Sequence, residues 1–307
     1  MGPEHKPLPP TMSYRLPLLV IASLSLACGS APSASRPVAP GAVPARQSQD
    51  PPPIDLLSYT RGQPACFHVA RASGDALVRA GGERCAQRFS PCSTFKIPNS
   101  IIGLETGLIQ DARSVIPWDH ERYPKESWWP ASWTDREHDL SSAFSHSIVP
   151  FYRSLATRIG ADAMGRYVRQ FRYGNEQTGP SLDSFWIDGA ITISADEQVR
   201  FLRDFYFEKL GVSSRSTRIV KEILVHERSG DHVLSAKTGT CDGPGQDTIG
   251  WVVGYVERGE DTHFYALNVS GRTLGDVDRA WRFEILGKML GELRLWPASG
   301  AADTAPE

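Results

Sequence analysis

The sequence has 307 residues, of which 22% are charged and 40% are hydrophobic, and its formal net charge is −2. A chain of this length forms one large domain or two small ones and can bury a sizeable core. The near-balance of charge gives no basic face, which argues against nucleic acid as a main partner. Beyond the N-terminal segment no apolar run reaches 18 residues, which excludes a protein with several membrane spans.

The N-terminal segment has the pattern of an export signal. One arginine precedes an apolar run over residues 16–27, and small residues follow, which is typical of a signal segment over 1–28 that is too short to span a membrane. We therefore expect an exported, periplasmic protein. Cys28 closes this run, and two outcomes stay open for it: attachment of a lipid, giving an outer-membrane-anchored lipoprotein, or simple cleavage.

The folded part of the chain lies between two segments of low complexity. Residues 29–54 and 297–307 consist mostly of small and polar residues, which cannot bury enough apolar surface to offset the entropy of ordering them. These compositions predict a disordered linker and a flexible tail. The single folded domain is therefore expected over 55–296.

Strand patterns lie at both ends of this domain, and helical patterns lie between them. Short strand-like runs at 67–70 and 76–79 surround Ser73-Gly74-Asp75, which predicts a hairpin. Further on, the patterns predict helices at 95–105, 141–160 (restarting at Pro150), 161–171, 194–207 and 217–225, strands at 232–237, 248–257 and 263–270, and a closing helix at 276–293. This order predicts an α+β fold in which an antiparallel sheet built from both chain ends carries flanking helices and an inserted helical lobe. A cleft beside the lobe is the expected active site, with the tryptophan-rich segment 118–133 next to it.

Ser93-Thr94-Phe95-Lys96 places a serine and a lysine three residues apart at the start of a predicted helix. Residues at this spacing share one helix face, so the hydroxyl and the amine can meet. A free serine is a poor nucleophile and needs a neighbouring base, and a lysine acts as a base only where burial favours loss of its proton. The motif is short, and by itself a capped surface helix explains it more simply.

Three other short motifs carry polar groups suited to catalysis. Lys237-Thr238-Gly239 ends a predicted strand, where a cation and a hydroxyl can hold a substrate carboxylate and the glycine lets a ligand approach the strand edge. The backbone N–H of Thr240 beside it can bind an oxyanion. Ser147-Ile148-Val149 places a hydroxyl at a helix junction, where it relays a proton or only caps a helix. Tyr173-Gly174-Asn175 is, taken alone, an ordinary turn.

The four motifs occur together and in the order S-x-x-K, S-x-V, Y-G-N, K-T-G, each in a fitting local structure. Their surroundings match as well, over residues 89–100, 185–189 and 250–255. From Cys66 to Leu293 the chain resembles a class D (oxacillinase-type) serine β-lactamase. Class A enzymes and penicillin-binding proteins share S-x-x-K and K-T-G, but Y-G-N and S-x-V favour class D.

The resemblance implies a mechanism. Ser93 attacks the β-lactam carbonyl and forms an acyl-enzyme, and the N–H groups of Ser93 and Thr240 form the oxyanion hole. Lys96 is N-carboxylated by carbon dioxide, and the carbamate is the general base, with no other cofactor. Only a neutral amine reacts with carbon dioxide, so a buried lysine suits this modification. Trp186 matches the family tryptophan whose indole N–H stabilises the carbamate, although it also suits a hydrophobic core.

The resemblance also assigns contacts with the substrate. Ser147 passes a proton toward the leaving nitrogen. An arginine upstream of the last helix lies on the far side of the substrate carboxylate; we predict Arg279, with Arg272 and Arg282 as competing candidates. The other residues implied to bind substrate are Val149, Lys237, Thr238 and Gly239, and the loop motif is Tyr173, Gly174 and Asn175.

Four cysteines lie in the folded part, and export permits disulfides. Four cysteines allow three pairings. Cys66 and Cys85 flank the first hairpin, which makes a local bridge plausible. Cys92 and Cys241 adjoin the two implied oxyanion donors, so a shared oxyanion hole would bring them together. Free thiols remain the alternative.

The predicted function is hydrolysis of small-molecule β-lactam antibiotics, which confers resistance. A β-lactam sensor domain that acylates without turnover is the alternative, and a peptidoglycan D,D-peptidase is less favoured because it lacks Y-G-N. Sensors need a membrane-spanning signalling region, and residues 1–54 have room for one signal segment only. The histidines are scattered and no C-x-x-C occurs, so no metal is expected. Oligomeric state and substrate spectrum stay open.

Overall fold

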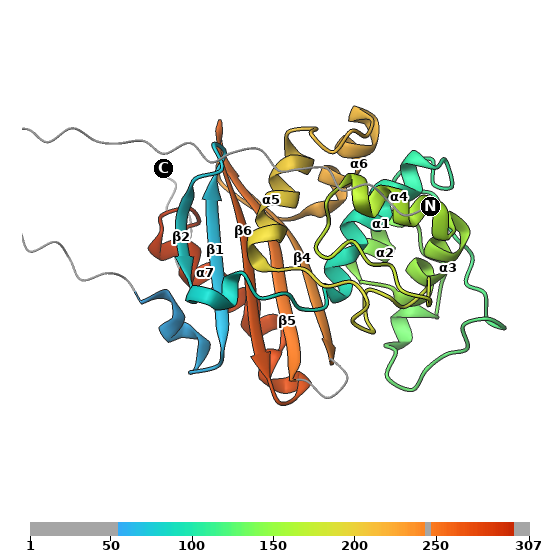
Figure 1. Ribbon diagram of the computed structural model, residues 1–307, viewed down its shortest axis with the longest axis horizontal. Coiled ribbons are helices and arrows are strands. Elements are labelled where there is room, and N and C mark those ends of the chain that lie inside the picture. Colours follow the sequence, from blue (N-terminus) through green and yellow to red (C-terminus); the bar gives the residue numbers. More distant parts are fainter. Residues whose placement is uncertain (1–54, 243–246, 298–307) are drawn as a thin grey trace, which may run out of the picture. The chain divides into compact units, whose positions relative to one another are not determined.

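A six-stranded antiparallel sheet is the centre of the part of the chain that the computed structural model describes, residues 55–242 and 247–297. The strand order is β2-β1-β6-β5-β4-β3 (Figure 1). The strands are β1 (Ala65–Arg71), β2 (Ala76–Ala80), β3 (Val225–Ser229), β4 (His232–Asp242), β5 (Thr248–Arg258) and β6 (Asp261–Gly271). Because β1 pairs with β6 along its whole length, both ends of the domain build one sheet, and the predicted α+β class is confirmed.

The central strands are covered on both faces, which explains why their sequences are almost continuously apolar. In β5, Val252 and Val256 belong to one hydrophobic cluster, whereas Trp251, Val253 and Tyr255 belong to another. This alternation follows from the two-residue period of a strand. The first cluster is completed by α7, and the second by helices of the inserted lobe.

The inserted lobe lies between β2 and β3 in the sequence. Figure 1 shows most of its helices gathered on the β4 side of the sheet, whereas α5 lies over the sheet and contacts β1, β5 and β6. The α-helices are α1 (Lys96–Glu105), α2 (Leu140–Ser145), α3 (Val149–Ile159), α4 (Ala161–Gln170), α5 (Ala195–Tyr206), α6 (Ser214–Leu224) and α7 (Arg279–Glu292). The 3₁₀ helices are η1 (Leu56–Thr60), η2 (Gly82–Cys85), η3 (Cys92–Phe95), η4 (Ala131–Trp133) and η5 (Leu274–Val277). Because the lobe packs beside β4, a cleft can form between the lobe and this strand.

Capping side chains define where two of the helices begin. The capping box predicted for α5 is present: the backbone N–H of Glu197 donates to Ser194 Oγ at 3.2 Å, and the N–H of Ser194 donates to Glu197 Oε2 at 3.0 Å. At the start of α7, Asp278 accepts from the N–H of Trp281 at 3.0 Å. These caps satisfy amide groups that the first turn of a helix leaves unpaired.

Two of the helical predictions have different outcomes. The interruption expected within 141–160 is confirmed: α2 ends at Ser145, and α3 begins at Val149 with Pro150 in its first turn, as predicted. The closing helix was expected from residue 276 but begins at Arg279, because η5 and the extended residue Asp278 precede it. In both cases a non-helical residue that carries a cap or a turn interrupts the apolar pattern.

Two strand predictions were also wrong in part. Strand β3 was missed: it follows α6 directly, is a mostly exposed edge strand, and has no apolar alternation to reveal it. Strand β4 was expected to end at Lys237 but runs on to Asp242, because pairing with β5 carries it past Gly239. The extension matters, since it includes Thr240 and Cys241.

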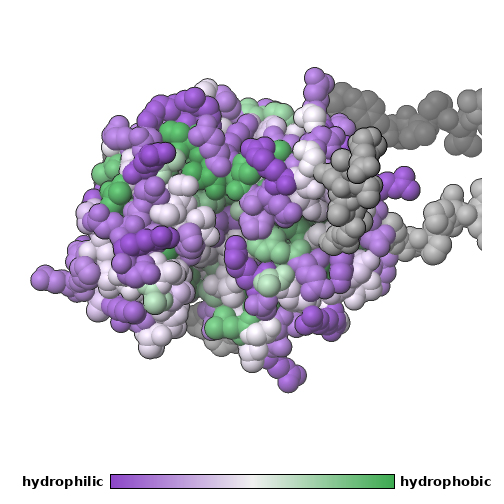
Figure 2. Space-filling model, turned by 180° about the vertical axis from the view of Figure 1, so that it is seen from behind, coloured by the Kyte–Doolittle hydropathy of each residue, from purple (hydrophilic) through white to green (hydrophobic). Residues whose placement is uncertain are grey.

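Figure 2 shows one face of the molecule, on which hydrophilic residues cover most of the surface and hydrophobic residues gather near the centre. Large hydrophobic side chains that stay exposed include Leu108, Trp128 and Leu274. No helix within the described ranges is long and apolar enough to cross a membrane. The predicted signal segment, the linker, Cys28 and nearly all of the predicted tail lie outside the described residues.

Leu286→Ala in α7 is expected to lower the free energy of unfolding by about 2–5 kcal/mol, because Leu286 is fully buried in the cluster between α7 and the sheet. The matched control is Leu274→Ala, at a side chain 59% exposed, which should change it by less than about 0.5 kcal/mol. Urea unfolding of both variants measures the difference. Equal losses would contradict the packing described for α7.

Candidate active site

The turn from η3 into α1 brings Ser93 and Lys96 together. Lys96 Nζ donates a hydrogen bond to Ser93 Oγ at 2.8 Å. The Lys96 side chain is only 1% exposed, and this burial, with a further contribution from the Arg153 cation, lowers the pKa of Lys96 to about 7. An amine with this pKa is about half neutral at pH 7 and largely neutral above it, so it can act as a base toward the serine hydroxyl.

Aromatic rings supply the apolar surroundings of this amine. Phe95 stacks on Trp186 with ring centroids 5.8 Å apart and meets Phe185 edge-on at 4.9 Å. Lys96 Nζ lies 5.3 Å from the ring centroid of Tyr152. The indole Nε1 of Trp186 is buried and has no hydrogen-bond partner among the described residues. Because a buried N–H without an acceptor is costly, this atom indicates a place for an acceptor group next to the Trp186 indole.

A second lysine faces the first across the site. Lys237 in β4 donates to Ser147 Oγ at 3.1 Å and to the carbonyl of Thr238 at 3.0 Å. Burial lowers the pKa of Lys237 well below its usual value, and the nearby Lys96 lowers it further. Ser147 sits between α2 and α3 with φ 59°, in the left-handed region that residues other than glycine rarely adopt. The site therefore joins two hydroxyls and two buried amines.

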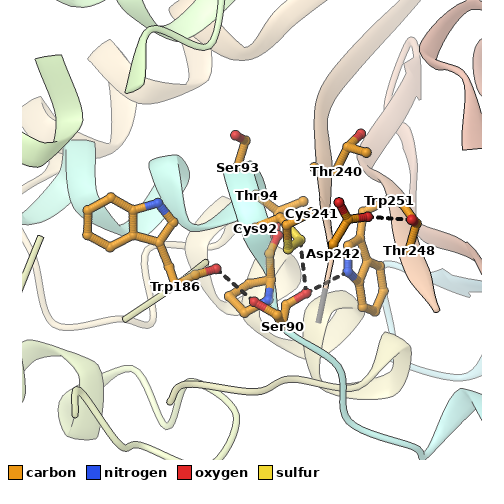
Figure 3. Close-up of a disulfide and its surroundings, with 12 residues drawn as sticks. Ser90, Cys92, Ser93, Thr94, Trp186, Thr240, Cys241, Asp242, Thr248 and Trp251 are labelled. Carbon is orange, nitrogen blue, oxygen red and sulfur yellow. Dashed lines mark hydrogen bonds between the residues drawn. A yellow bond between two sulfur atoms is a disulfide. The ribbon is translucent and has the colours of Figure 1, made fainter. Parts of the chain in front are cut away.

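Close packing of β4 on η3 brings Thr240 to the side of Ser93 (Figure 3). A Cβ atom at Gly239 would lie 2.7 Å from the carbonyl oxygen of Pro91 and 3.2 Å from the backbone nitrogen of Thr94. Only glycine leaves room for the two backbones at this distance. The close contact between β4 and η3 therefore requires glycine at position 239. This requirement is separate from the predicted role of the glycine, which is to let a ligand approach the strand edge.

The structure separates the three arginine candidates. Arg279 is exposed in the first turn of α7 and lines a pocket together with Lys237 and Thr238, and its predicted contact with a substrate carboxylate stays a prediction. Arg272 is exposed and does not line that pocket. Arg282 is 1% exposed, and its guanidinium donates to the carbonyls of Gly239 and Trp251 and to Thr240 Oγ1, at 2.7, 2.6 and 2.6 Å. Arg282 therefore stabilises the C-terminal end of β4 through these hydrogen bonds.

The Y-G-N motif lies behind the site. Tyr173 is buried and packs edge-on against Phe95. Gly174 has φ 58°, and a Cβ there would lie 1.9 Å from the carbonyl oxygen of Thr192. Asn175 donates to the carbonyl of Ala190 at 2.9 Å and accepts from the N–H of Thr192 at 3.1 Å. The motif therefore anchors the loop that follows Trp186.

Val149, predicted to contact substrate, is buried in the first turn of α3.

The tryptophan-rich segment 118–133 is irregular apart from η4, as predicted. It lines a cavity of about 340 Å³ with Ile148, the middle residue of the S-x-V motif, and Pro150, which follows that motif. Trp133 Nε1 donates to the carbonyl of His146 at 3.1 Å, next to Ser147. The segment is tied to α3 through Glu126, which pairs with Arg153 at 2.8 Å.

Within the part of the chain that the structure describes, two disulfides are present: Cys66–Cys85 joins β1 to η2, and Cys92–Cys241 joins η3 to β4. Both hypothesised pairings are thus found in the structure. Ser90, which the sequence did not single out, lies beside the second bridge. Its hydroxyl donates to the carbonyl of Trp186 at 2.8 Å, and its carbonyl accepts from Trp251 Nε1 at 2.9 Å (Figure 3). No local pattern identifies Ser90, because both partners are distant in sequence.

The chain matches the family model of the penicillin binding protein transpeptidase domain over residues 68–287. It is 43% identical over 187 residues to β-lactamase OXA-48 of Klebsiella pneumoniae, covering 61% of this chain and 68% of that protein. The solved class D β-lactamase YbXI from Nostoc aligns with a TM-score of 0.73 and 31% identity, covering 79% of this chain and 100% of that one. The chain belongs to the class D β-lactamase family.

This class D β-lactamase is therefore a serine hydrolase of β-lactams. It is also 35% identical over 184 residues to the regulatory protein BlaR1 of Bacillus licheniformis, covering 60% of this chain and 30% of that protein. Within the described residues no group of three or more His, Cys, Asp or Glu side chains is placed to hold a metal ion. The roles of individual site residues remain predictions.

Gly239→Ala is expected to lower the acylation rate by at least about tenfold, because the added methyl pushes β4 away from η3 and misplaces the site by a few tenths of an ångström or more. Gly275→Ala is the control: its Cβ would meet only Thr273 Oγ1, at 3.6 Å, so its rate should stay within about twofold. Single-turnover kinetics on the folded variants measures both. An unchanged rate for Gly239→Ala would refute the tight packing.

Proposed function

We propose that this class D β-lactamase hydrolyses β-lactam antibiotics through an acyl-enzyme on Ser93, uses N-carboxylated Lys96 as its general base, and confers β-lactam resistance. The observation that carries this proposal is the 2.8 Å contact between Ser93 Oγ and the amine of Lys96, which is 1% exposed. A buried amine that touches the nucleophile serves as a base or as the attachment point of one.

The surroundings of Lys96 fit the carbamate. A neutral amine attacks the carbon of carbon dioxide, the new C–N bond forms as one C=O π pair moves onto oxygen, and one proton leaves the nitrogen, so an anionic carbamate replaces the neutral amine. The unpartnered Nε1 of Trp186 supplies a donor for that anion. Lys237, whose pKa is lowered partly by Lys96, would gain an opposite charge as its neighbour. When formed, the carbamate provides a base that can take the Ser93 proton.

The other proposed site groups surround the β-lactam amide bond that is broken in the reaction. The N–H groups of Ser93 and Thr240 lie on η3 and on the end of β4 and are the proposed donors to the oxyanion. Ser147 Oγ, held by Lys237 Nζ at 3.1 Å, is placed to pass a proton to the leaving nitrogen. Lys237, Thr238 and Arg279 line one pocket and form a cationic site for the substrate carboxylate.

The similarity to BlaR1 favours one second candidate, a sensor that is acylated and does not turn over. The proposed hydrolase should convert many equivalents of a chromogenic cephalosporin per protein molecule, and Ser93→Ala should abolish conversion while the fold is retained. Stopped-flow absorbance measures the stoichiometry. A burst of one equivalent followed by no further reaction would support the sensor and overturn the hydrolase.

Hydrolysis is expected to depend on carbon dioxide and pH. Because the pKa of Lys96 is lowered to about 7, the amine becomes neutral as pH rises through 7. At fixed dissolved carbon dioxide, activity should therefore rise from pH 6 to pH 8. Degassing should reduce activity, and bicarbonate should restore it.

Trp186→Phe keeps an aromatic ring but removes the proposed donor, so the half-saturating bicarbonate concentration should rise about tenfold or more. Trp296→Phe, which lies in the other hydrophobic cluster, is the control and should leave that concentration unchanged. Steady-state rates over a bicarbonate series measure the shift. If the activity of both variants did not change with bicarbonate concentration, the carbamate would be excluded.

We also propose that the protein is exported to the periplasm, with or without a lipid on Cys28. Two disulfides within the described residues support an oxidising compartment. Cell fractionation, with and without Cys28→Ser, tests this proposal: a cytoplasmic full-length chain would contradict export.

A further inference from the structure

One disulfide adjoins both halves of the proposed oxyanion hole. Cys92 immediately precedes Ser93, and Cys241 immediately follows Thr240. The bridge between these cysteines holds their Cα atoms 5.7 Å apart across a separation of 149 residues. Figure 3 shows Ser93 and Thr240 on either side of the bridge. The two proposed donors are thus joined by a short covalent path.

The η3 side of this path has a strained backbone. Cys92 has φ 50°, a left-handed conformation that a residue other than glycine adopts only where its surroundings hold it. The following turn is tight, because the N–H and the hydroxyl of Thr94 both donate to the carbonyl of Pro91, at 3.1 and 2.7 Å. Ser93 therefore takes its position from a turn whose strained residue is itself one end of the bridge.

The β4 side is held by noncovalent contacts of its own. Thr240 and Cys241 pair with Gly250 and Ile249 of β5, and Arg282 binds the carbonyl of Gly239 and the hydroxyl of Thr240. This side is fixed to the sheet whether or not the bridge is closed. Breaking the bridge would therefore release mainly the η3 side.

A separate contact holds the start of η3 near the carbamate pocket. The Ser90 carbonyl accepts from Trp251 Nε1, and the Ser90 hydroxyl donates to the carbonyl of Trp186. The Ser90 carbonyl also lies 3.5 Å from Cys92 Sγ, but its bond with Trp251 and the bond of the Ser90 hydroxyl with Trp186 do not require the bridge. Opening the bridge should therefore leave the surroundings of Lys96 in place while Ser93 N–H shifts relative to Thr240 N–H.

We propose that the Cys92–Cys241 disulfide is a positioning element of the oxyanion hole, so that acylation of Ser93 depends on the oxidation state of this bridge. The inference rests on the proposed function of the Ser93 and Thr240 amides as oxyanion donors. Such donors act through fixed geometry, and displacing them costs rate without weakening the binding of the ground state. Reduction by a dithiol breaks the S–S bond and leaves thiols on both cysteines, while the dithiol loses two electrons and two protons and closes to its own disulfide.

The second bridge is a control within the same chain. Cys66 and Cys85 are both 0% exposed and join β1 to η2, away from Ser93. Cys241 is 8% exposed, so a reductant in solution reaches the Cys92–Cys241 bridge more easily. Mild reduction of the folded protein should open this bridge first.

The test compares the double variants Cys92→Ala/Cys241→Ala and Cys66→Ala/Cys85→Ala at a temperature where circular dichroism shows both folded. For the first variant we expect the acylation rate constant for a chromogenic cephalosporin to fall about ten- to a hundredfold, with unchanged substrate Kd and half-saturating bicarbonate concentration. For the second variant the rate constant should change by less than about twofold. Equal acylation rates in the two variants would overturn the positioning role.

Reduction of the unaltered protein provides a test without substitutions. Dithiothreitol should lower its acylation rate, reoxidation should restore the rate, and Cys92→Ala/Cys241→Ala should not respond to either treatment. A rate that stays constant while mass spectrometry shows the Cys92–Cys241 bridge reduced would also overturn the inference. Absence of an acyl group on Ser93 in the unaltered, oxidised protein would instead overturn the proposed function.

Discussion

The contact between the Lys96 amine and the Ser93 hydroxyl depends on keeping an amine out of water, and much of the surrounding structure serves that requirement. Burying a charged ammonium group is costly, so its pKa falls to about 7 and the neutral form prevails above that pH. Phe95, Trp186 and Tyr152 provide the apolar enclosure. In the proposed mechanism this enclosure both makes the lysine a base and favours its reaction with carbon dioxide, and the unpartnered indole N–H of Trp186 is the proposed donor to the carbamate.

The other half of the site is an extension of the central sheet. Hydrogen bonds from the Arg282 guanidinium hold the C-terminal end of β4, and Gly239 lets that strand lie directly against η3. Cys92, which precedes Ser93, and Ser147 itself have left-handed backbones, which only well-determined surroundings sustain. Segments outside the sheet thus contribute Ser93, Lys96 and Ser147, and strand β4 contributes Lys237, so the proposed chemistry depends on how accurately these parts are held together.

Sequence patterns predicted the sheet from both chain ends, the Ser93–Lys96 turn and the capping box at Ser194, because these depend on local spacing. They did not predict β3, which is a polar edge strand, or the end of β4, which is set by pairing with β5. Arg282 and Ser90 could not be assigned, since their partners lie far away in the sequence. Among the arginine candidates only the fold separates a side chain that faces the pocket from one that supports a strand.

The most direct test of the account is ¹³C NMR of the protein in ¹³C-labelled bicarbonate. We predict one carbamate carbon resonance per protein molecule, which is absent in Lys96→Ala and which strengthens in parallel with hydrolytic activity as bicarbonate is added. A fully active protein without such a resonance, or one whose resonance persists after Lys96→Ala, would contradict the central claim that a dry, neutral amine beside Ser93 becomes the catalytic base.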